Sequence, residues 1–509
     1  MTARPKVKVE MTLQLFDTLS DKKKPFVPAD PKQAKIYVCG PTTYDDAHIG
    51  HARPCVVYDV LVRHLRSEGL EVLYVRNVTD IDDKIINRAA QNQEEPAVLS
   101  ARMFESYCTD MRRLHNLEPD HQPKVSEHLP EIIAMIETLI KKGHAYPSAG
   151  DVYFDVSSFR EYGKLSHRDL SQLEAGASER LDETETARKR HAYDFALWKG
   201  APEGSVSWPS PWGPGRPGWH IECSAMSMKF LGESFDLHGG GLDLVFPHHE
   251  NEIAQSECAT GKCLASHWMH NGFVQVNKEK MSKSTGNFFR LREAFDRVEP
   301  EAVRYGLLSA HYRAPFNLDI DLDEQGKVRG FPQFAEAEAR VEYLYATQLK
   351  LGAIPEPRLV DQDAKIPLEI SEFGARLAAV LNDDLNTAQA IGHCAGLLKA
   401  INEVCDAALL KKGSLAKNVQ QAAGVALARV GQVLGLGLDE PQAFLERVRD
   451  RRALGRGIDR AWVEACIERR ASARLDKDFA AADAARDDLT QKGVELLDTP
   501  QGTSWRLSR

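Results

Sequence analysis

Residues 35–78 read KIYVCGPTTYDDAHIGHARPCVVYDVLVRHLRSEGLEVLYVRNV, and this stretch decides the fold class. Residues 35–39 form a short apolar run that predicts a buried strand, which a Gly-Pro turn follows. Apolar residues then recur at helical spacing over about 51–66, and residues 70–78 predict a second strand. Strand, helix and strand in this order form a βαβ unit, which opens a parallel, doubly wound sheet.

The rest of the chain divides into three regions. An α/β pattern continues to about residue 325, with an insertion at about 120–220, and long amphipathic helices follow it. One predicted helix carries an apolar stripe formed by Leu377, Val380, Leu381, Ala388, Ile391, Cys394, Leu397, Leu398 and Ile401. We therefore predict an α/β domain over residues 12–325, an all-α bundle over 326–435 and a small C-terminal unit over 436–509.

Length and composition exclude several classes of protein. The 509 residues are too many for one hydrophobic core. Runs of about 18 apolar residues and the apolar centre of a signal peptide are both missing, so we expect no membrane span and no secretion. Nine irregularly spaced cysteines fit a reducing compartment, and we predict a cytoplasmic protein. Because the net charge is -9, a nucleic-acid partner would need a local basic patch.

The first chemical signal is a His-Ile-Gly-His sequence between the first strand and the first helix. The N-terminus of such a helix offers free backbone N–H groups and a positive dipole to an anion. Gly50 would let a phosphate approach the backbone, and His48 and His51 can donate to phosphoryl oxygens. Taken alone, these residues are equally well explained as surface histidines.

The second signal is the sequence KMSKS at 280–284, which lies between a predicted strand and a predicted helix. Lys280 and Lys283 bracket small hydroxyl residues, an arrangement that suits a loop closing on a polyphosphate. A solvated basic turn is the alternative interpretation. Both motifs occur once, in order, at strand–helix junctions of one α/β region, and this pairing favours phosphate binding.

The third signal is a set of residues with metal-ligand chemistry. Cys39 ends the first strand, and Cys223 lies in the segment GWHIECSAM. His248 and Glu252 are four residues apart, so a helix would place both side chains on one face. Two thiolates, an imidazole and a carboxylate suit Zn²⁺. Buried unreactive cysteines and a surface His–Glu pair remain the alternative explanation.

Together these segments resemble the class I aminoacyl-tRNA synthetases and, among them, the cysteinyl-tRNA synthetases. Both phosphate motifs match the class signature without substitution. The other matching segments are YVCGPT, NVTDIDDKI, GWHIECSAM, FDLHGGGLDLVFPHHENEIAQSE and AVRYGLLSAHYR. The resemblance extends, with gaps, from about residue 12 to the carboxyl end. It implies a Rossmann-type catalytic domain, a helical bundle and a C-terminal anticodon-recognition unit.

The resemblance also implies substrates and site residues. ATP, L-cysteine and tRNA(Cys) would be the substrates of a monomeric enzyme, with Mg²⁺ accompanying the ATP. The implied catalytic residues are His48, His51, Lys280 and Lys283. The implied ATP-binding residues are Gly50, His48, His51, Met281, Ser282 and Lys283. One zinc ion would be held by Cys39, Cys223, His248 and Glu252. His248 is chosen over His249 because it aligns with the family motif. The implied cysteine pocket consists of Thr79, Trp219, His238 and Asp243, each of which also has a purely structural interpretation.

The C-terminal region contains a candidate basic patch. Residues 447–475 hold nine arginines and four acidic residues, which predicts a surface for a phosphate backbone. Trp462 and Trp505 offer faces on which unpaired bases could stack. Ion pairing and core packing are the alternatives. Two other functions stay open at this stage: a cysteine ligase acting on an amino-sugar, as in mycothiol biosynthesis, and a non-catalytic zinc-containing RNA-binding module.

Overall fold

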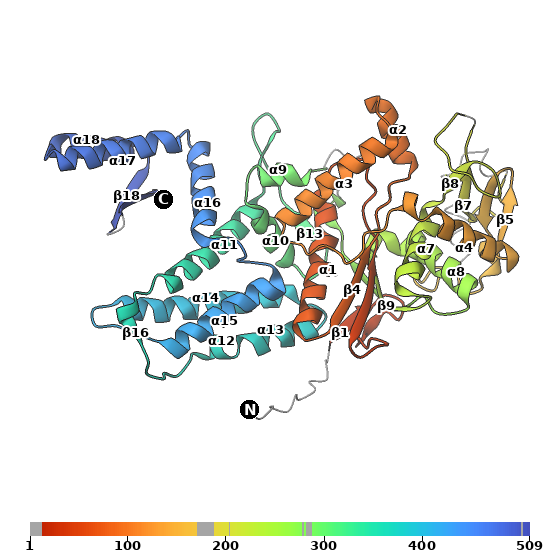
Figure 1. Ribbon diagram of the computed structural model, residues 1–509, viewed down its shortest axis with the longest axis horizontal. Helices are drawn as coiled ribbons and strands as arrows, with labels where there is room; N and C mark the ends of the chain where they lie inside the picture. The colour runs from red at the N-terminus through yellow and green to blue at the C-terminus, as the bar shows by residue number, and fades with distance from the viewer. Residues whose placement is uncertain are drawn as a thin grey trace.

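The computed structural model describes residues 13–169, 188–202, 204–276, 279–280, 288–499 and 502–508. The molecule is elongated. An α/β region lies at one end, a helical bundle follows, and the C-terminal helices α16 to α18 lie at the other end (Figure 1).

A four-stranded parallel sheet forms the centre of the α/β region. Its strands are β3 (Gln33–Val38), β4 (Glu71–Arg76), β9 (Phe235–Gly241) and β10 (Ala265–Asn271), in the order β10-β9-β3-β4. All three strand pairs are parallel. Helix α1 (Ile49–Ser67) connects β3 to β4, so the predicted βαβ unit is confirmed.

The sequence explains this arrangement locally. Apolar side chains from Ile49 to Leu65 are buried along most of α1, because the helix lies between the sheet and the helical bundle. Directly after β3, the chain passes very close to the end of β4. A Cβ on Gly40 would lie 1.7 Å from the carbonyl oxygen of Asn77, so the close approach requires glycine.

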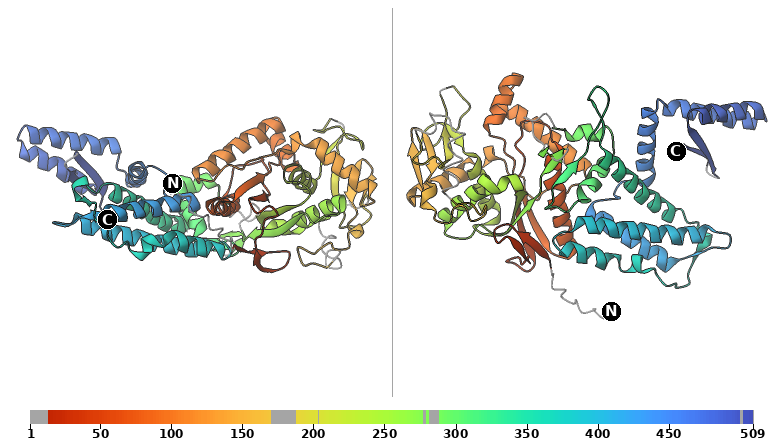
Figure 2. Two further views of the ribbon diagram at one scale, coloured as in Figure 1. Left: turned by 60° about the horizontal axis from the view of Figure 1, so that its bottom comes forward. Right: turned by 180° about the vertical axis from the view of Figure 1, so that it is seen from behind.

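The insertion between β4 and β9 is long, and its part after about residue 120 builds the end of the α/β region that lies away from the bundle (Figure 2). Its helices are α2 (Asp83–Asn92), α3 (Pro96–Arg113), α4 (Leu129–Lys141) and α7 (Trp219–Leu231). An antiparallel sheet contains β5 (Ala145–Ser148), β6 (Asp151–Phe154), β7 (Phe195–Gly200) and β8 (Gly215–Pro217). After β9, a π-helical turn (Val245–His249) leads into α8 (Glu250–Thr260).

Helices dominate the second half of the chain. They are α9 (Leu291–Phe295), α10 (Pro300–Leu308), α11 (Pro332–Gly352), α12 (Leu368–Ser371), α13 (Phe373–Asn382), α14 (Thr387–Leu409) and α15 (Lys417–Leu434). The C-terminal unit contains α16 (Pro441–Gly455), α17 (Arg460–Leu475), α18 (Phe479–Gln491), β18 (Val494–Thr499) and β19 (Gly502–Leu507). In the described part of the chain, every helix is too short or too polar to cross a lipid bilayer.

The prediction of one helix along the 377–401 stripe is wrong. The stripe is shared by α13 and α14, and the chain between them turns through Asp384 and Leu385, with φ angles of 59° and 48°. The Asp384 carboxylate accepts hydrogen bonds from the backbone N–H of Phe16 at 2.8 Å and from the Tyr312 hydroxyl at 2.7 Å. These distant partners hold the turn. Periodicity missed it because both helices keep an apolar face toward the same core.

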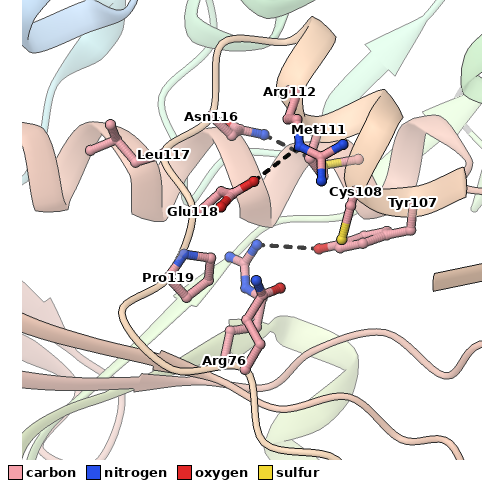
Figure 3. Close-up of a pocket in the computed structure, with 10 residues that line it drawn as sticks. Arg76, Tyr107, Cys108, Met111, Arg112, Asn116, Leu117, Glu118 and Pro119 are labelled. Carbon is pink, nitrogen blue, oxygen red and sulfur yellow. Dashed lines mark hydrogen bonds and ion pairs between the residues drawn. The ribbon is translucent and has the colours of Figure 1, made fainter. Parts of the chain in front are cut away.

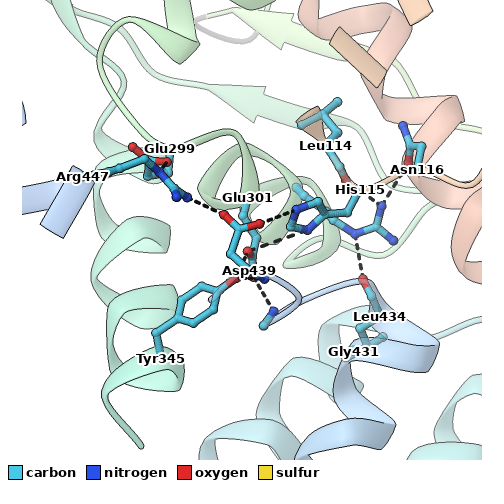
Figure 4. Close-up of polar contacts among 12 residues, drawn as sticks. Leu114, His115, Asn116, Glu299, Glu301, Tyr345, Gly431, Leu434, Asp439 and Arg447 are labelled. Carbon is cyan, nitrogen blue, oxygen red and sulfur yellow. Dashed lines mark hydrogen bonds and ion pairs between the residues drawn. The ribbon is translucent and has the colours of Figure 1, made fainter. Parts of the chain in front are cut away.

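A buried polar network joins the α/β region to the bundle (Figure 4). We call its members, Arg304, Glu301, His115, Tyr345 and Asp439, the junction network. Arg304 is fully buried, pairs with Asp59 and donates to the Leu434 carbonyl oxygen at 2.7 Å. Glu301 accepts from the Tyr345 hydroxyl and from the backbone N–H of Gly437, both at 2.5 Å. His115 Nε2 lies 3.2 Å from Asp439 Oδ1.

Candidate functional site

A cleft of about 300 Å³ lies at the carboxyl ends of the parallel strands. Its walls include Cys39 and Gly40 after β3, Arg76 at the end of β4, Asp243 after β9 and Asn271 at the end of β10. Open α/β sheets bind ligands at this edge, where loops diverge and helix N-termini point inward. The fold therefore presents a cleft for small ligands at this edge.

The first phosphate motif lies on this cleft. His48, Gly50 and His51 all line it, at the N-terminus of α1. The two imidazole rings stack with centroids 3.6 Å apart. His51 Nδ1 accepts from the backbone N–H of His48 at 3.3 Å, which leaves Nε2 as the donor of a neutral ring. The arrangement can offer N–H groups and a helix dipole to an anion.

The second motif lies mostly outside the described residues. Met281, Ser282 and Lys283 fall there, and Lys280 is described by its backbone alone, in β12 (Glu279–Lys280). Strand β12 pairs with β11 (Val274–Val276), and Val274 lines the cleft. The strand that leads toward the motif therefore borders the site, and the roles of its lysines stay a prediction.

The four predicted metal ligands converge on one point beside the cleft. The ligand atoms of Cys39, Cys223, His248 and Glu252 all lie within 4.8 Å of one another. The two sulfur atoms are 3.8 Å apart, and His248 Nε2 lies 3.0 Å from Glu252 Oε1. Two thiolates bound at about 2.3 Å to a tetrahedral ion would be separated by about 3.8 Å. The donor set and its spacing therefore fit zinc.

The electrostatics of these groups also favour a cation. Burial lowers the pKa of His248, but the charges of Glu252 and Cys223 outweigh it and raise that pKa to about 10. Burial raises the pKa of Glu252, but His238 and His248 outweigh it and lower that pKa to about 2. Burial likewise raises the pKa of Cys223, and the hydrogen bond from Cys39 together with His248 lowers it to about 6. At neutral pH the buried Glu252 carboxylate and Cys223 thiolate therefore face a protonated His248, whose proton a bound cation would replace.

A second set of ligands overlaps the first. Cys39, His238, His249 and Glu252 also bring their ligand atoms within 4.8 Å of one another. His249 Nε2 lies 3.2 Å from Cys39 Sγ, and His238 Nε2 lies 2.8 Å from Glu252 Oε2. The two sets share Cys39 and Glu252. Geometry alone thus leaves both His248 and His249 as candidate ligands.

The four residues predicted for the cysteine pocket occupy different depths. Trp219 and Asp243 line the cleft, and the Trp219 ring stacks on His248 with centroids 4.3 Å apart. Thr79 and His238 lie behind the cleft wall. Thr79 donates to Glu222 Oε2 at 2.8 Å, and His238 is fully buried against Glu252. The pocket assignment of all four residues stays a prediction.

Sequence reasoning missed two histidines that support the candidate ligands. His220 Nδ1 lies 3.0 Å from His248 Nδ1, and His270 Nε2 lies 2.8 Å from His249 Nδ1. Such partners fix the orientation of metal-binding imidazoles. His220 belongs to the matching segment GWHIECSAM and could have been found, whereas His270 lies on β10, a strand that the pattern did not reveal.

The nine arginines of residues 447–475 all have partners within the described structure. Arg447, Arg451 and Arg452 pair with acids of α10, α11 or the segments beside them. The remaining six are Arg449, Arg456, Arg460, Arg469, Arg470 and Arg474. Trp505 is only 6% exposed, with Arg449 4.0 Å above its ring. Trp505 is therefore a core residue, and its ring is not available for stacking on a base.

Comparisons with known proteins agree with this geometry. Residues 25–327 match the family model described as the tRNA synthetases class I (C) catalytic domain, and residues 376–439 match the DALR domain. The chain is 48% identical to the cysteine–tRNA ligase of Geobacter sulfurreducens, over 98% of this chain and 100% of that protein. It belongs to the cysteine–tRNA ligase family. The ligase of an Anaeromyxobacter species (strain K) shares the same identity, 48%, over 98% of this chain and 100% of its own.

Solved structures show that the fold is shared more widely than the family. The Mycobacterium tuberculosis methionyl-tRNA synthetase in complex with methionyl-adenylate superimposes with a TM-score of 0.58 at 14% identity. The match covers 82% of this chain and 94% of that chain. The predicted class I synthetase fold and the assignment to the ligases are confirmed. The comparisons support neither the amino-sugar ligase nor the non-catalytic RNA-binding module.

Proposed function

We propose that this chain activates L-cysteine with ATP and transfers it to the 3′ end of tRNA(Cys). Cysteinyl-adenylate and pyrophosphate would form in the first step. The observation that carries the proposal is the position of Cys39, which lines the same cleft as His48 and His51 and also belongs to the candidate metal cluster. Groups suited to phosphate and groups suited to a thiolate ligand thus share one cleft.

In the activation step, the residues of this chain orient the substrates and stabilise charge, and they do not need to transfer protons. The attacking group is a carboxylate, which is already an anion and needs no general base. Catalysis therefore depends on alignment and on stabilising negative charge at the α-phosphate. His48, His51 and the N-terminus of α1 supply donors on that side. In this proposal Lys280 and Lys283 hold the departing pyrophosphate, and Mg²⁺ accompanies the ATP.

Selection of cysteine rests on the metal cluster. One zinc ion would be held by Cys39, Cys223, His248 and Glu252. Zinc is a soft Lewis acid, so it binds the thiolate of a cysteine substrate far better than the hydroxyl of serine. The side chain of valine has no atom that could bind zinc. Shape alone distinguishes such side chains by only about 1–3 kcal/mol per methylene-sized difference. In this proposal Trp219 and Asp243 form walls of the cysteine pocket beside the metal cluster. Thr79 and His238 lie behind those walls and hold Glu222 and Glu252 by hydrogen bonds.

Further parts of the proposal concern the rest of the chain. The helices beyond residue 326 bind the tRNA, and residues 436–509 recognise its anticodon. The protein acts as a monomer in the cytoplasm. The DALR match at residues 376–439 supports the assignment of this half to tRNA binding.

The test is amino-acid-dependent exchange of pyrophosphate into ATP, run with cysteine, serine and valine, with and without a zinc chelator. We expect exchange with cysteine alone, and its loss when zinc is removed. Cys223→Ser should lose the same activity, whereas Cys263→Ser is the matched control because Cys263 is an exposed cysteine outside the cluster. A folded, metal-loaded protein without exchange would overturn the proposal.

A further inference from the structure

A cavity other than the substrate cleft lies where the α/β region meets the C-terminal unit. Its volume is about 350 Å³, a size typical of ligand pockets. Three separate regions line it, with Arg113 at the end of α3, Glu299 and Pro300 at the start of α10, and Phe444 on α16. We call it the junction cavity. In the described part of the chain it shares no lining residue with the substrate cleft.

The acidic side chains around the junction cavity already have partners (Figure 4). Glu299 pairs with Arg447 at 3.1 Å and with Arg451 at 2.7 Å. Asp439 pairs with the same Arg447. Glu301 accepts hydrogen bonds within the junction network. Each of these acids therefore has a partner other than the cavity's remaining cation.

That cation is Arg113, which is exposed and whose guanidinium stays charged at every physiological pH. Within the described residues it forms no ion pair and no side-chain hydrogen bond. Its guanidinium lies over the Phe295 ring, 4.4 Å from the ring centre. Asp110, one turn earlier on α3, pairs with Arg292 at 3.1 Å instead. Arg113 therefore offers the cavity an accessible guanidinium that can bind an anion through two N–H groups.

The neighbouring arginine on α3 has a different environment. Arg112 Nε donates to Glu118 at 3.0 Å (Figure 3), and Arg112 also pairs with Glu105 at 3.2 Å. Arg112 borders a separate cavity of about 30 Å³, which holds about one water molecule. Both arginines are exposed and lie on one helix. They differ in pairing, so Arg112 is a matched control for Arg113.

The location of the junction cavity favours one kind of anion. Tyr107, six residues before Arg113, lines the substrate cleft, so α3 extends from the cleft to the junction cavity. On the other side of the cavity, α16 leads to α17 and α18 at the end of the molecule (Figure 1). A folded tRNA holds its 3′ end and its anticodon at opposite ends of one rigid molecule. Its middle part therefore passes between the two protein regions that bind those ends.

Charge also favours RNA as the occupant. Every nucleotide carries a phosphate, and a protein with a net charge of -9 must hold these phosphates through local cations. Resting on the proposed ligase function, we propose that the junction cavity binds the sugar–phosphate backbone of tRNA between its 3′ end and its anticodon, with Arg113 as the phosphate ligand. The contact adds affinity and fixes the position of the tRNA, and it carries no base specificity.

The first test measures binding of tRNA(Cys) to the full-length protein over a series of potassium chloride concentrations. Arg113→Met should weaken binding at least about fivefold at low salt and lower the slope of log affinity against log salt by about one. Arg113→Lys should keep most of the slope, because lysine retains the charge. Arg112→Met should leave the slope unchanged. A purely structural role of Arg113 would alter urea unfolding without altering the slope.

Three results would overturn the inference. The first is an Arg113→Met protein with unchanged affinity and slope. The second is an equal loss in Arg112→Met, which would mean that general charge is responsible. The third uses inorganic phosphate as the probe. If Arg113→Met abolishes phosphate binding but leaves tRNA affinity unchanged, the cavity belongs to a free anion.

A second measurement tests which part of the tRNA reaches the cavity. A stem–loop with the anticodon and a minihelix with the 3′ end each occupy one end of the protein, so both should bind equally well to Arg113→Met and to the unmodified sequence. A loss with either fragment would contradict the placement. In aminoacylation, the KM for tRNA should rise at least about fivefold while kcat changes less. Cysteine-dependent pyrophosphate exchange uses no tRNA, so failure of the proposed ligase function is distinguishable from failure here.

Discussion

The metal cluster and the junction network both place charged side chains in largely buried positions beside a cavity, yet they are built in opposite ways. In the junction network, each carboxylate faces hydrogen-bond donors: Glu301 accepts from a tyrosine hydroxyl and a backbone N–H. In the metal cluster, potential metal ligands face one another instead. Glu252 Oε1 lies 3.6 Å from Cys39 Sγ and 3.0 Å from His248 Nε2. The first region is complete by itself, whereas the second gains from an added cation.

This difference separates buried charges that stabilise the fold from buried charges that serve a binding site. Buried polar groups that are fully paired stabilise one arrangement of the chain. Buried acceptors that converge without enough donors repel one another until protons or a metal ion neutralise them. Burial and charge are therefore not enough to distinguish the two regions. The balance of hydrogen-bond donors to acceptors distinguishes them. Four predictions test this contrast.

The largest effect is expected for Arg304→Met in the junction network. The change removes one of the two arginines that pair with the buried Asp59, the other being Arg63. It also leaves the Leu114 and Leu434 carbonyl oxygens without their donor, and these losses together cost about 3–5 kcal/mol. Urea unfolding should show the loss, while the zinc content of the folded protein stays unchanged. Arg460→Met is the control, because Arg460 forms exposed pairs worth about 1 kcal/mol or less. A loss of zinc in Arg304→Met would contradict the separation of the two regions.

Glu252→Ala should act mainly on zinc binding. It removes a shared member of both ligand sets, so zinc affinity and cysteine-dependent exchange should fall at least about 100-fold. Glu257→Gln is the matched control on the same helix, where Glu257 pairs with Lys164 at 2.5 Å. Retained zinc in Glu252→Ala, measured by atomic absorption, would refute the assignment.

His248→Gln and His249→Gln sharpen the choice between the overlapping ligand sets. We expect His248→Gln to weaken zinc binding at least about tenfold more than His249→Gln, because the set with both cysteines offers the softer ligands. Competition with a chromophoric chelator measures both affinities. The opposite order would assign the ion to the set containing His238 and His249.

His115→Gln should have the smallest effect and a defined pH dependence. Burial lowers the pKa of His115, but the Asp439 hydrogen bond and the Glu301 and Asp439 charges outweigh it and raise that pKa above its usual 6.5. A raised pKa means that the protonated ring stabilises the fold below about pH 6.5, and that this contribution disappears as the pH rises through the folded-state value. His115→Gln should therefore lose roughly 0.5–1 kcal/mol at about pH 6 and less at about pH 9, by urea unfolding. A difference that is the same at both pH values would contradict this.

The sequence by itself determined the βαβ unit, the parallel-sheet class and the identity of the family. Local periodicity reports which face of an element is buried, and this was enough for β3, α1 and β4. The motifs also selected four candidate ligands separated by up to 213 residues, which the structure brings within 4.8 Å. That selection depended on resemblance, because spacing alone allowed an unreactive set of cysteines.

Only the tertiary structure decided which side chains meet. It placed His249 and His238 against the same Cys39 and Glu252, and it brought Arg76 to Cys55. It broke one apolar stripe into α13 and α14, and it gave every arginine of residues 447–475 a partner. Periodicity records the backbone geometry of one element at a time. Contacts between elements depend on how whole faces pack, and the sequence does not display that packing.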